Sequence, residues 1–184
     1  MNNVVKLPTM NELIQDTEMG LKENAFMVLC NQNPPENWLV NHPMISGYRY
    51  LPIERVEYLL TRVFGDWSVE IRDSKVIANS MVVCVRLHVV NPVTGKEQFQ
   101  DGIGASPIQT DKGCGAMDWN HAKADGVQKS APAAESYAIK DAAEKFGKLF
   151  GKDVSRKNTM DYTGLLKQNN LNEENAKRHG ENIG

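Results

Sequence analysis

The chain has 184 residues, of which 41% are hydrophobic and 24% are charged, a composition typical of one soluble domain with modest extensions. No stretch approaches the roughly 20 apolar residues that a membrane-spanning helix needs, and residues 1–8 lack the basic region and apolar core of a signal peptide. The formal net charge of −2 argues against a protein that coats nucleic acid through its overall charge. Three widely spaced cysteines form no CxxC pair, which predicts free thiols in a reducing cytoplasm: Cys30, Cys84 and Cys114.

The first predicted elements are two helices. A short acidic helix is expected over residues 10–24, and a stretch rich in Pro and Asn follows over residues 31–43. The second helix is expected to begin near Pro52, which suits a first helical turn, and to end before Gly65. Its apolar residues recur with the period of an amphipathic helix: Ile53, Val56, Leu59, Leu60, Val63 and Phe64.

Three strands are predicted next, because apolar and polar residues alternate between turn signals. In the second strand, Arg86 and His88 share the face opposite to the apolar one. The apolar face holds Met81, Val83, Val85, Leu87 and Val89. The expected bounds are a strand over 67–72, a turn at 73–74, a strand over 76–90, a hairpin loop over 91–95, and a strand over 96–106.

The last predicted helix follows a loop over residues 107–129 that shows no periodicity. The helix is expected to run from Ser130, an N-cap, to Phe150, with Gly151 as its stop. Its apolar stripe consists of Ile139, Ala142, Ala143, Phe146 and Phe150.

These elements predict an α+β fold in which helices pack on a three-stranded antiparallel sheet. We expect residues 1–47 to form an N-terminal helix and loop that serve oligomerisation, and residues 48–157 to form the functional core. Residues 158–184 are polar, which predicts a disordered tail. A single three-stranded sheet leaves two unpaired edges, which predicts contacts between subunits and a homo-oligomer of many subunits.

The sequence supports no site for a nucleotide, a metal or catalysis. Residues 147–153 come nearest to a phosphate-binding P-loop, but the segment is one residue short and lacks the hydroxyl that binds magnesium. No nucleophile, base and orienting group can be assembled, so no catalytic residue and no cofactor are expected. Three possible metal ligands match no standard zinc spacing, and we interpret them as incidental loop residues: Cys114, Asp118 and His121.

The remaining signal is positive charge near the end of the core. Residues 129–157 hold seven basic and four acidic residues, a net charge of +3. A local excess of this kind indicates nucleic-acid binding, with a solvated helix face as the alternative interpretation. On a helical wheel, Lys145, Lys148 and Lys152 fall within an arc of roughly 60° and are candidate DNA contacts.

Further candidates lie on the last helix and in the strands. Lys140 lies on the opposite flank of the apolar stripe, and Arg86 is on the polar face of its strand. Gly102 and Gly104 lie near the end of the third strand. Because they lack side chains, we expect them either to let a phosphodiester backbone approach closely or to bend the strand.

Three segments, in this order, resemble the Rad fifty-two superfamily of single-strand annealing proteins, including the Sak-type recombinases of bacteriophages. The first is residues 50–67, a helix that ends in Phe-Gly before a Trp that opens a strand. The second is Val-Arg-Leu at 85–87, which leads through a hairpin to Asp-Gly-Ile-Gly at 101–104. The third is residues 134–151, whose Lys, Phe-Gly and final Gly match the family helix.

The resemblance implies a β-β-β-α core, ring-like oligomers, and a groove that holds the DNA backbone with its bases exposed for pairing. It implies a DNA contact at Lys140 and another at Lys75, near the start of a family strand. Arg49 is the basic residue nearest to a third family contact, before the first family helix. Two positions that are basic in the family are acidic here, Asp141 and Glu144.

We therefore predict a phage-encoded DNA-binding protein, in a bacterial host cytoplasm, that anneals complementary single strands in recombination and repair without ATP. Basic side chains on the DNA backbone give sequence-tolerant, salt-sensitive binding, and annealing needs only that phosphate repulsion be neutralised. We expect the tail to tether a partner such as a host single-strand-binding protein. Two alternatives stay open: a double-stranded RNA-binding module with the same order of elements, and a metal-dependent nuclease that uses the acids of residues 101–129.

Overall fold

The computed structural model describes residues 16–43 and 45–156, which divide into two units. One unit holds the described residues up to Gln32 together with Arg156, and the other holds residues 33–155. Among the helices described, none combines the length and the apolar character needed to cross a membrane. The predicted tail lies outside the described residues.

The first unit contains helix α2, Thr17–Cys30. Asp16 caps its N-terminus, since the Asp16 side chain accepts a hydrogen bond from the backbone N–H of Met19 at 3.1 Å. The helix continues past the predicted end at residue 24, because residues 25–30 contain no Gly or Pro that would stop it. The predicted start, over residues 10–15, lies outside the described part of the chain.

The second unit opens with the 3-10 helix η1 (Glu36–Trp38) and a short antiparallel pair, β1 (Val40–Asn41) and β2 (Arg49–Tyr50). Helix α3 (Ile53–Phe64) follows, so the predicted helix between Pro52 and Gly65 is confirmed. Gly65 ends it with a φ of 77°, a left-handed conformation that residues with side chains rarely adopt. The buried face of α3 holds Val56, Leu59, Leu60 and Phe64.

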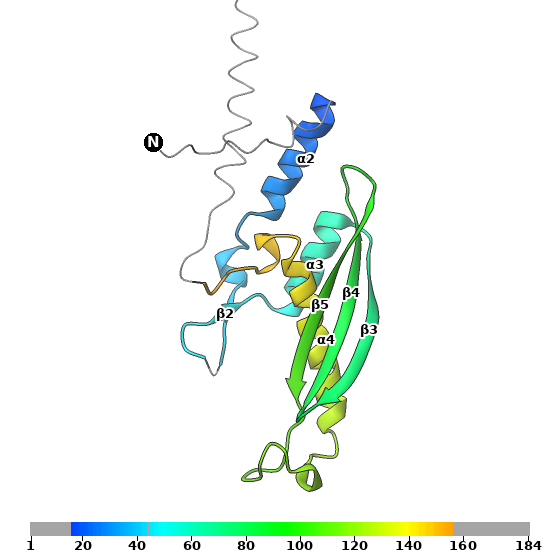
Figure 1. The fold of residues 1–184 in the computed structure, drawn as a ribbon. Coiled ribbons are helices and arrows are strands. Elements are labelled where there is room, and N and C mark those ends of the chain that lie inside the picture. Colours follow the sequence, from blue (N-terminus) through cyan, green and yellow to red (C-terminus); the bar gives the residue numbers. More distant parts are fainter. Residues whose placement is uncertain (1–15, 44, 157–184) are drawn as a thin grey trace, which may run out of the picture. The chain divides into compact units, whose positions relative to one another are not determined.

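Three long strands form an antiparallel sheet in the order β3-β4-β5, which confirms the predicted fold class (Figure 1). Their bounds are β3 Trp67–Ile77, β4 Ser80–Val90 and β5 Glu97–Pro107. The predicted alternation in β4 is also confirmed, because Val83, Val85, Leu87 and Val89 are buried while Arg86 and His88 are half-exposed on the other face.

The predicted boundary between the first two strands is wrong. β3 runs through Asp73 and Ser74, and its pairing with β4 shifts register between Ile71 and Asp73. This bulge absorbs an extra residue without ending the strand. The chain reverses at residues 78 and 79 instead, where Ala78 has a φ of 53°.

Helix α4 (Gly126–Glu144) begins and ends earlier than predicted. Ser130 lies inside the helix, where its hydroxyl donates to the Val127 carbonyl at 3.3 Å, and therefore is not the N-cap. The helix does not reach Phe150, because Gly147 adopts a φ of 151° and a separate 3-10 helix, η3 (Lys148–Phe150), follows.

Helix α4 packs against β4 and β5 and covers one face of the sheet (Figure 1). Ala134, Ala138 and Ala142, spaced four residues apart, are fully buried in this contact. A Cβ atom at Gly102 would lie 2.1 Å from the Ala138 carbonyl oxygen, and one at Gly104 would lie 2.1 Å from the Ala134 carbonyl oxygen. The backbone of α4 fills the space left by the two glycines, so of the two alternatives expected there, this space is not open to a phosphodiester backbone.

Candidate nucleic-acid interface

Lys140 lies on α4 between two tyrosine rings. Its Nζ is 4.9 Å from the ring centroid of Tyr50, on β2, and 4.8 Å from that of Tyr137, one helical turn earlier. Burial lowers the pKa of Lys140, because desolvation penalises the ammonium, while the nearby carboxylates of Glu144 and Glu54 act in the opposite direction. Within the described residues the Lys140 ammonium forms no ion pair, and its cation–π contacts with the two ring faces add to the attraction of the nearby carboxylates.

β2 is held in place beside this lysine by Ser155. The backbone N–H of Arg49 donates to the Ser155 hydroxyl at 2.7 Å, and that hydroxyl donates to the Arg49 carbonyl at 2.6 Å. The Arg49 guanidinium forms an ion pair with Glu36 at 2.5 Å. Arg49 precedes Tyr50 in β2, and Lys140 lies over the Tyr50 ring. We call Arg49, Tyr50, Tyr137 and Lys140 the tyrosine–lysine cluster.

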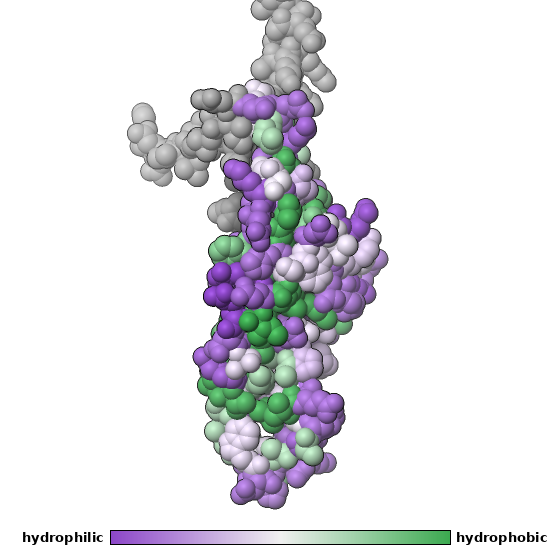
Figure 2. Space-filling view, turned by 90° about the vertical axis from the view of Figure 1, so that its right-hand side faces the viewer, coloured by the Kyte–Doolittle hydropathy of each residue, from purple (hydrophilic) through white to green (hydrophobic). Residues whose placement is uncertain are grey.

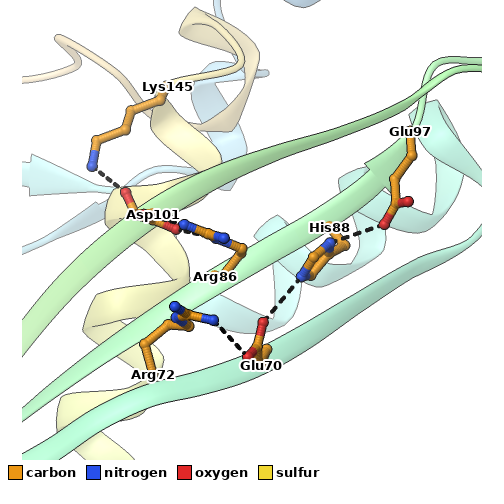
Figure 3. A network of polar contacts seen from close by, with 7 residues as sticks. All are labelled: Glu70, Arg72, Arg86, His88, Glu97, Asp101 and Lys145. Atoms are coloured by element: carbon orange, nitrogen blue, oxygen red, sulfur yellow. Dashed lines mark hydrogen bonds and ion pairs between the residues drawn. The ribbon is translucent and has the colours of Figure 1, made fainter.

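Charged side chains on the open face of the sheet neutralise one another, as Figure 3 shows. Arg86 donates two hydrogen bonds to the Asp101 carboxylate, at 2.7 and 2.9 Å, and stacks 4.1 Å from the centroid of Phe99. The hydrogen bond from Arg86 lowers the pKa of Asp101. The His88 ring lies between two carboxylates: its Nδ1 is 3.0 Å from the Glu97 carboxylate, and its Nε2 is 3.4 Å from the Glu70 carboxylate. Arg86 is thus already paired in the free protein.

Lys145 and Asp141 cap the free edge of β5. The Lys145 ammonium donates to the Asp101 carbonyl and lies 3.0 Å from the Asp141 carboxylate, which accepts a hydrogen bond from the Ile103 N–H at 3.1 Å. Because β5 is an edge strand, these backbone groups have no strand partner in the described sheet. These contacts give Asp141 a structural role at the edge of β5, and they occupy the Lys145 ammonium.

The other predicted lysines lie apart. Since α4 ends at Glu144, the predicted helical arc of Lys145, Lys148 and Lys152 does not form. Lys148 is only 5% exposed, which leaves little of its side chain for a phosphate, whereas Lys152 is exposed in the turn after η3. Lys75 is ion-paired with Asp73 at 2.7 Å on β3. The DNA contacts of these residues stay predictions.

A model of the Rad52/22 family of double-strand break repair proteins matches residues 31–176. The chain belongs to this family. The predicted superfamily membership is confirmed, and it assigns the chain to DNA recombination and repair through strand annealing. Comparison with curated proteins gives no match.

Sequence reasoning missed both tyrosines of this Rad52/22 family protein. The sequence could have indicated Tyr137, because residues three apart on a helix are neighbours and Lys140 is a candidate DNA contact. Tyr50 had none, since its contact with Lys140 joins segments far apart in the chain. The structure also brings together three residues that could hold a metal: Cys114, Asp118 and His121, with ligand atoms within 4.8 Å of one another.

Proposed function

We propose that this Rad52/22 family protein binds single-stranded DNA and anneals complementary strands without ATP, as a homo-oligomer, with the tyrosine–lysine cluster on the DNA backbone. The observation that carries the proposal is Lys140, a half-buried ammonium held between two rings with no ion pair among the described residues. The phage-encoded Sak-type subgroup and the cytoplasmic location are part of the same proposal, by resemblance.

A phosphate is a suitable partner for Lys140 because a desolvated cation gains most from an anion that reaches it. Tyr137, 48% exposed, offers a ring face beside the same ammonium. Cations on the phosphates together with exposed aromatic faces are what sequence-tolerant single-strand binding uses. Arg49, Arg86 and Lys145 contribute less than Lys140, because each must first give up a carboxylate or carbonyl partner.

Annealing on this surface needs no nucleotide hydrolysis, since it requires only neutralised phosphates and accessible bases. The segment that comes nearest to a P-loop supports the same proposal. Gly147 follows a helix and precedes η3, whose first residue, Lys148, is buried, whereas a P-loop lies between a strand and a helix with its lysine on the phosphates.

The side of the unit that carries β3 supports self-association. Ile71, Val76 and Ile77 expose 58%, 46% and 50% of their surface, and no described strand pairs with the outer edge of β3. Figure 2 views the molecule from the side on which β3 lies in Figure 1 and shows hydrophobic patches between hydrophilic ones. We propose that a second copy of this chain covers part of this surface. Light scattering at micromolar concentration tests the proposal, and a monodisperse monomer with and without DNA would contradict it.

The test of the DNA contact is a salt series on unrelated single strands with Lys140→Met, which removes the charge and keeps an aliphatic side chain. We expect affinity to fall about 10-fold or more for every sequence, and the slope of log affinity against log salt to flatten by about 0.7. Lys140→Arg should retain most of the binding. Lys129→Met is the matched control, because Lys129 is an exposed lysine on the same helix, paired with Asp125.

Equal binding by Lys140→Met and the control would place the DNA elsewhere. Competition between single strands and duplex RNA separates annealing from the double-stranded RNA alternative. Incubating labelled single strands with and without a chelator tests the nuclease alternative.

A further inference from the structure

The loop between β5 and α4 is closed at its base by backbone contacts. Thr110 and Ala122 form an isolated antiparallel bridge, and the Asp111 N–H donates to the His121 carbonyl at 2.9 Å. Above this base, none of residues 111–121 is buried, and Met117 and Trp119 expose 57% and 46% of their surface. No apolar core therefore holds the loop in one conformation.

Two local turns bring three different metal-ligating side chains together at this place. The Cys114 N–H donates to the Asp111 carbonyl at 3.1 Å, and the His121 N–H donates to the Asp118 carbonyl at 3.0 Å in the 3-10 helix η2 (Trp119–His121). The ligand atoms of Cys114, Asp118 and His121 all lie within 4.8 Å of one another. The spacing in sequence hides this arrangement, because it arises from the turns.

The donors are one sulfur, one imidazole nitrogen and one carboxylate oxygen. This set suits zinc and related transition metals, whereas calcium and magnesium require oxygen ligands. Bonds of about 2.0–2.3 Å in a tetrahedral site separate ligand atoms by roughly 3.4 Å. The three side chains therefore need to approach one another by at most about 1.4 Å, the difference between 4.8 and 3.4 Å.

The two ring nitrogens of His121 face different carboxylates. Nε2 lies 4.0 Å from Asp118, a member of the cluster, and Nδ1 lies 3.8 Å from Asp111. Metal-bound histidines commonly donate their other ring N–H to a carboxylate, which fixes the tautomer and the ring orientation. Asp111 is positioned for that supporting contact.

We propose that Cys114, Asp118 and His121 bind one divalent transition-metal ion of the zinc class, with Asp111 orienting the His121 ring, and that the ion fixes the loop. The proposal uses none of the residues assigned to DNA, so either proposal can fail without the other.

The first experiment titrates the reduced, metal-free full-length protein with Co²⁺ and follows the absorption of tetrahedral cobalt and of the thiolate–cobalt bond. We expect one Co²⁺ per chain, displaced by Zn²⁺, and loss of the thiolate band in Cys114→Ser. His121→Ala should weaken binding by more than 100-fold, and Asp111→Asn should weaken it by about 10-fold or more.

Cys84→Ser and His88→Gln are matched controls, because they change the same residue types outside the loop and should bind Co²⁺ like the unmodified protein. Cys30 is unsuited to metal binding because burial raises the pKa of its thiol to about 12. The proposal would be overturned if the unmodified protein showed no thiolate–cobalt band, or if Cys84→Ser lost that band as fully as Cys114→Ser.

Limited trypsin digestion gives a second, independent readout. Lys112 lies in the loop and Lys96 in the β4–β5 hairpin, and both are exposed. With free Zn²⁺ at 100 times its dissociation constant, cleavage that requires the loop to open should slow by up to about 100-fold at Lys112, with Lys96 unaffected. No slowing at Lys112, or equal slowing at both sites, would refute the assignment of the metal to this loop.

Discussion

Replacing Gly104 by alanine should destabilise the unit formed by residues 33–155. The new Cβ would lie 2.1 Å from the Ala134 carbonyl oxygen and 2.4 Å from the Ala138 nitrogen, where ordinary contacts begin at 3.4 Å. Both contacts are with helix backbone, which cannot rotate away as a side chain can, so α4 must retreat by about 1.3 Å, the difference between 3.4 and 2.1 Å.

Overpacking of this kind costs about 1–3 kcal/mol, and the backbone clash argues for the upper end. Alanine also restricts the unfolded chain, which offsets about 0.4–1 kcal/mol. The net loss of about 2 kcal/mol should lower the midpoint of thermal unfolding by roughly 5–10 °C. We would measure urea and thermal unfolding by circular dichroism at one fixed protein concentration, because self-association shifts the apparent stability.

Gly115→Ala is the matched control, because no atom lies within 4 Å of its added Cβ and its φ is not left-handed. It should change stability by less than about 0.5 kcal/mol. If the Gly104→Ala protein were as stable as the Gly115→Ala protein, the account of how α4 packs on β5 would be refuted.

Three further outcomes are expected. Affinity for single strands should fall as pH rises through the lowered pKa of Lys140, because phosphate binds the charged ammonium; Lys140→Arg should lose that dependence in anisotropy titrations, since guanidinium stays charged. Asp141→Ala should expose the Ile103 N–H on the β5 edge and increase aggregation measured by light scattering, with the exposed Asp66→Ala as a control away from that edge. Truncation after residue 167 should leave annealing of naked strands intact in a fluorescence assay; loss of DNA binding would show that the predicted core boundary is wrong.

The parts of the fold that follow from local periodicity could be predicted from the sequence. α3 and the two faces of β4 are examples, because their patterns of burial repeat over several turns or residue pairs. The turn at residue 78 was missed because a bulge let β3 pass through Asp73, which resembles a turn residue. The early start of α4 was missed because Pro132 lies inside the helix, where proline is usually disfavoured.

The candidate site was harder to predict because it depends on contacts between distant segments. Lys140 was identified from local charge and resemblance, but its partner Tyr50 comes from β2. Lys148 was placed on a helix that Gly147 interrupts, and the structure buries it. Gly102 and Gly104 are explained by α4, which no pattern within β5 could reveal.

The capped edge of β5 limits the symmetry with which subunits can assemble. A ring whose sheet continues from subunit to subunit needs a heterologous contact, in which the β3 edge of one copy pairs with the β5 edge of the next. Asp141 and Lys145 already occupy backbone groups at the middle of β5. Pairing between two β3 edges remains open, but that contact is isologous and closes at two subunits. Contacts between side-chain surfaces would join a ring of many subunits without displacing Asp141 and Lys145, with each copy presenting two different faces to its neighbours.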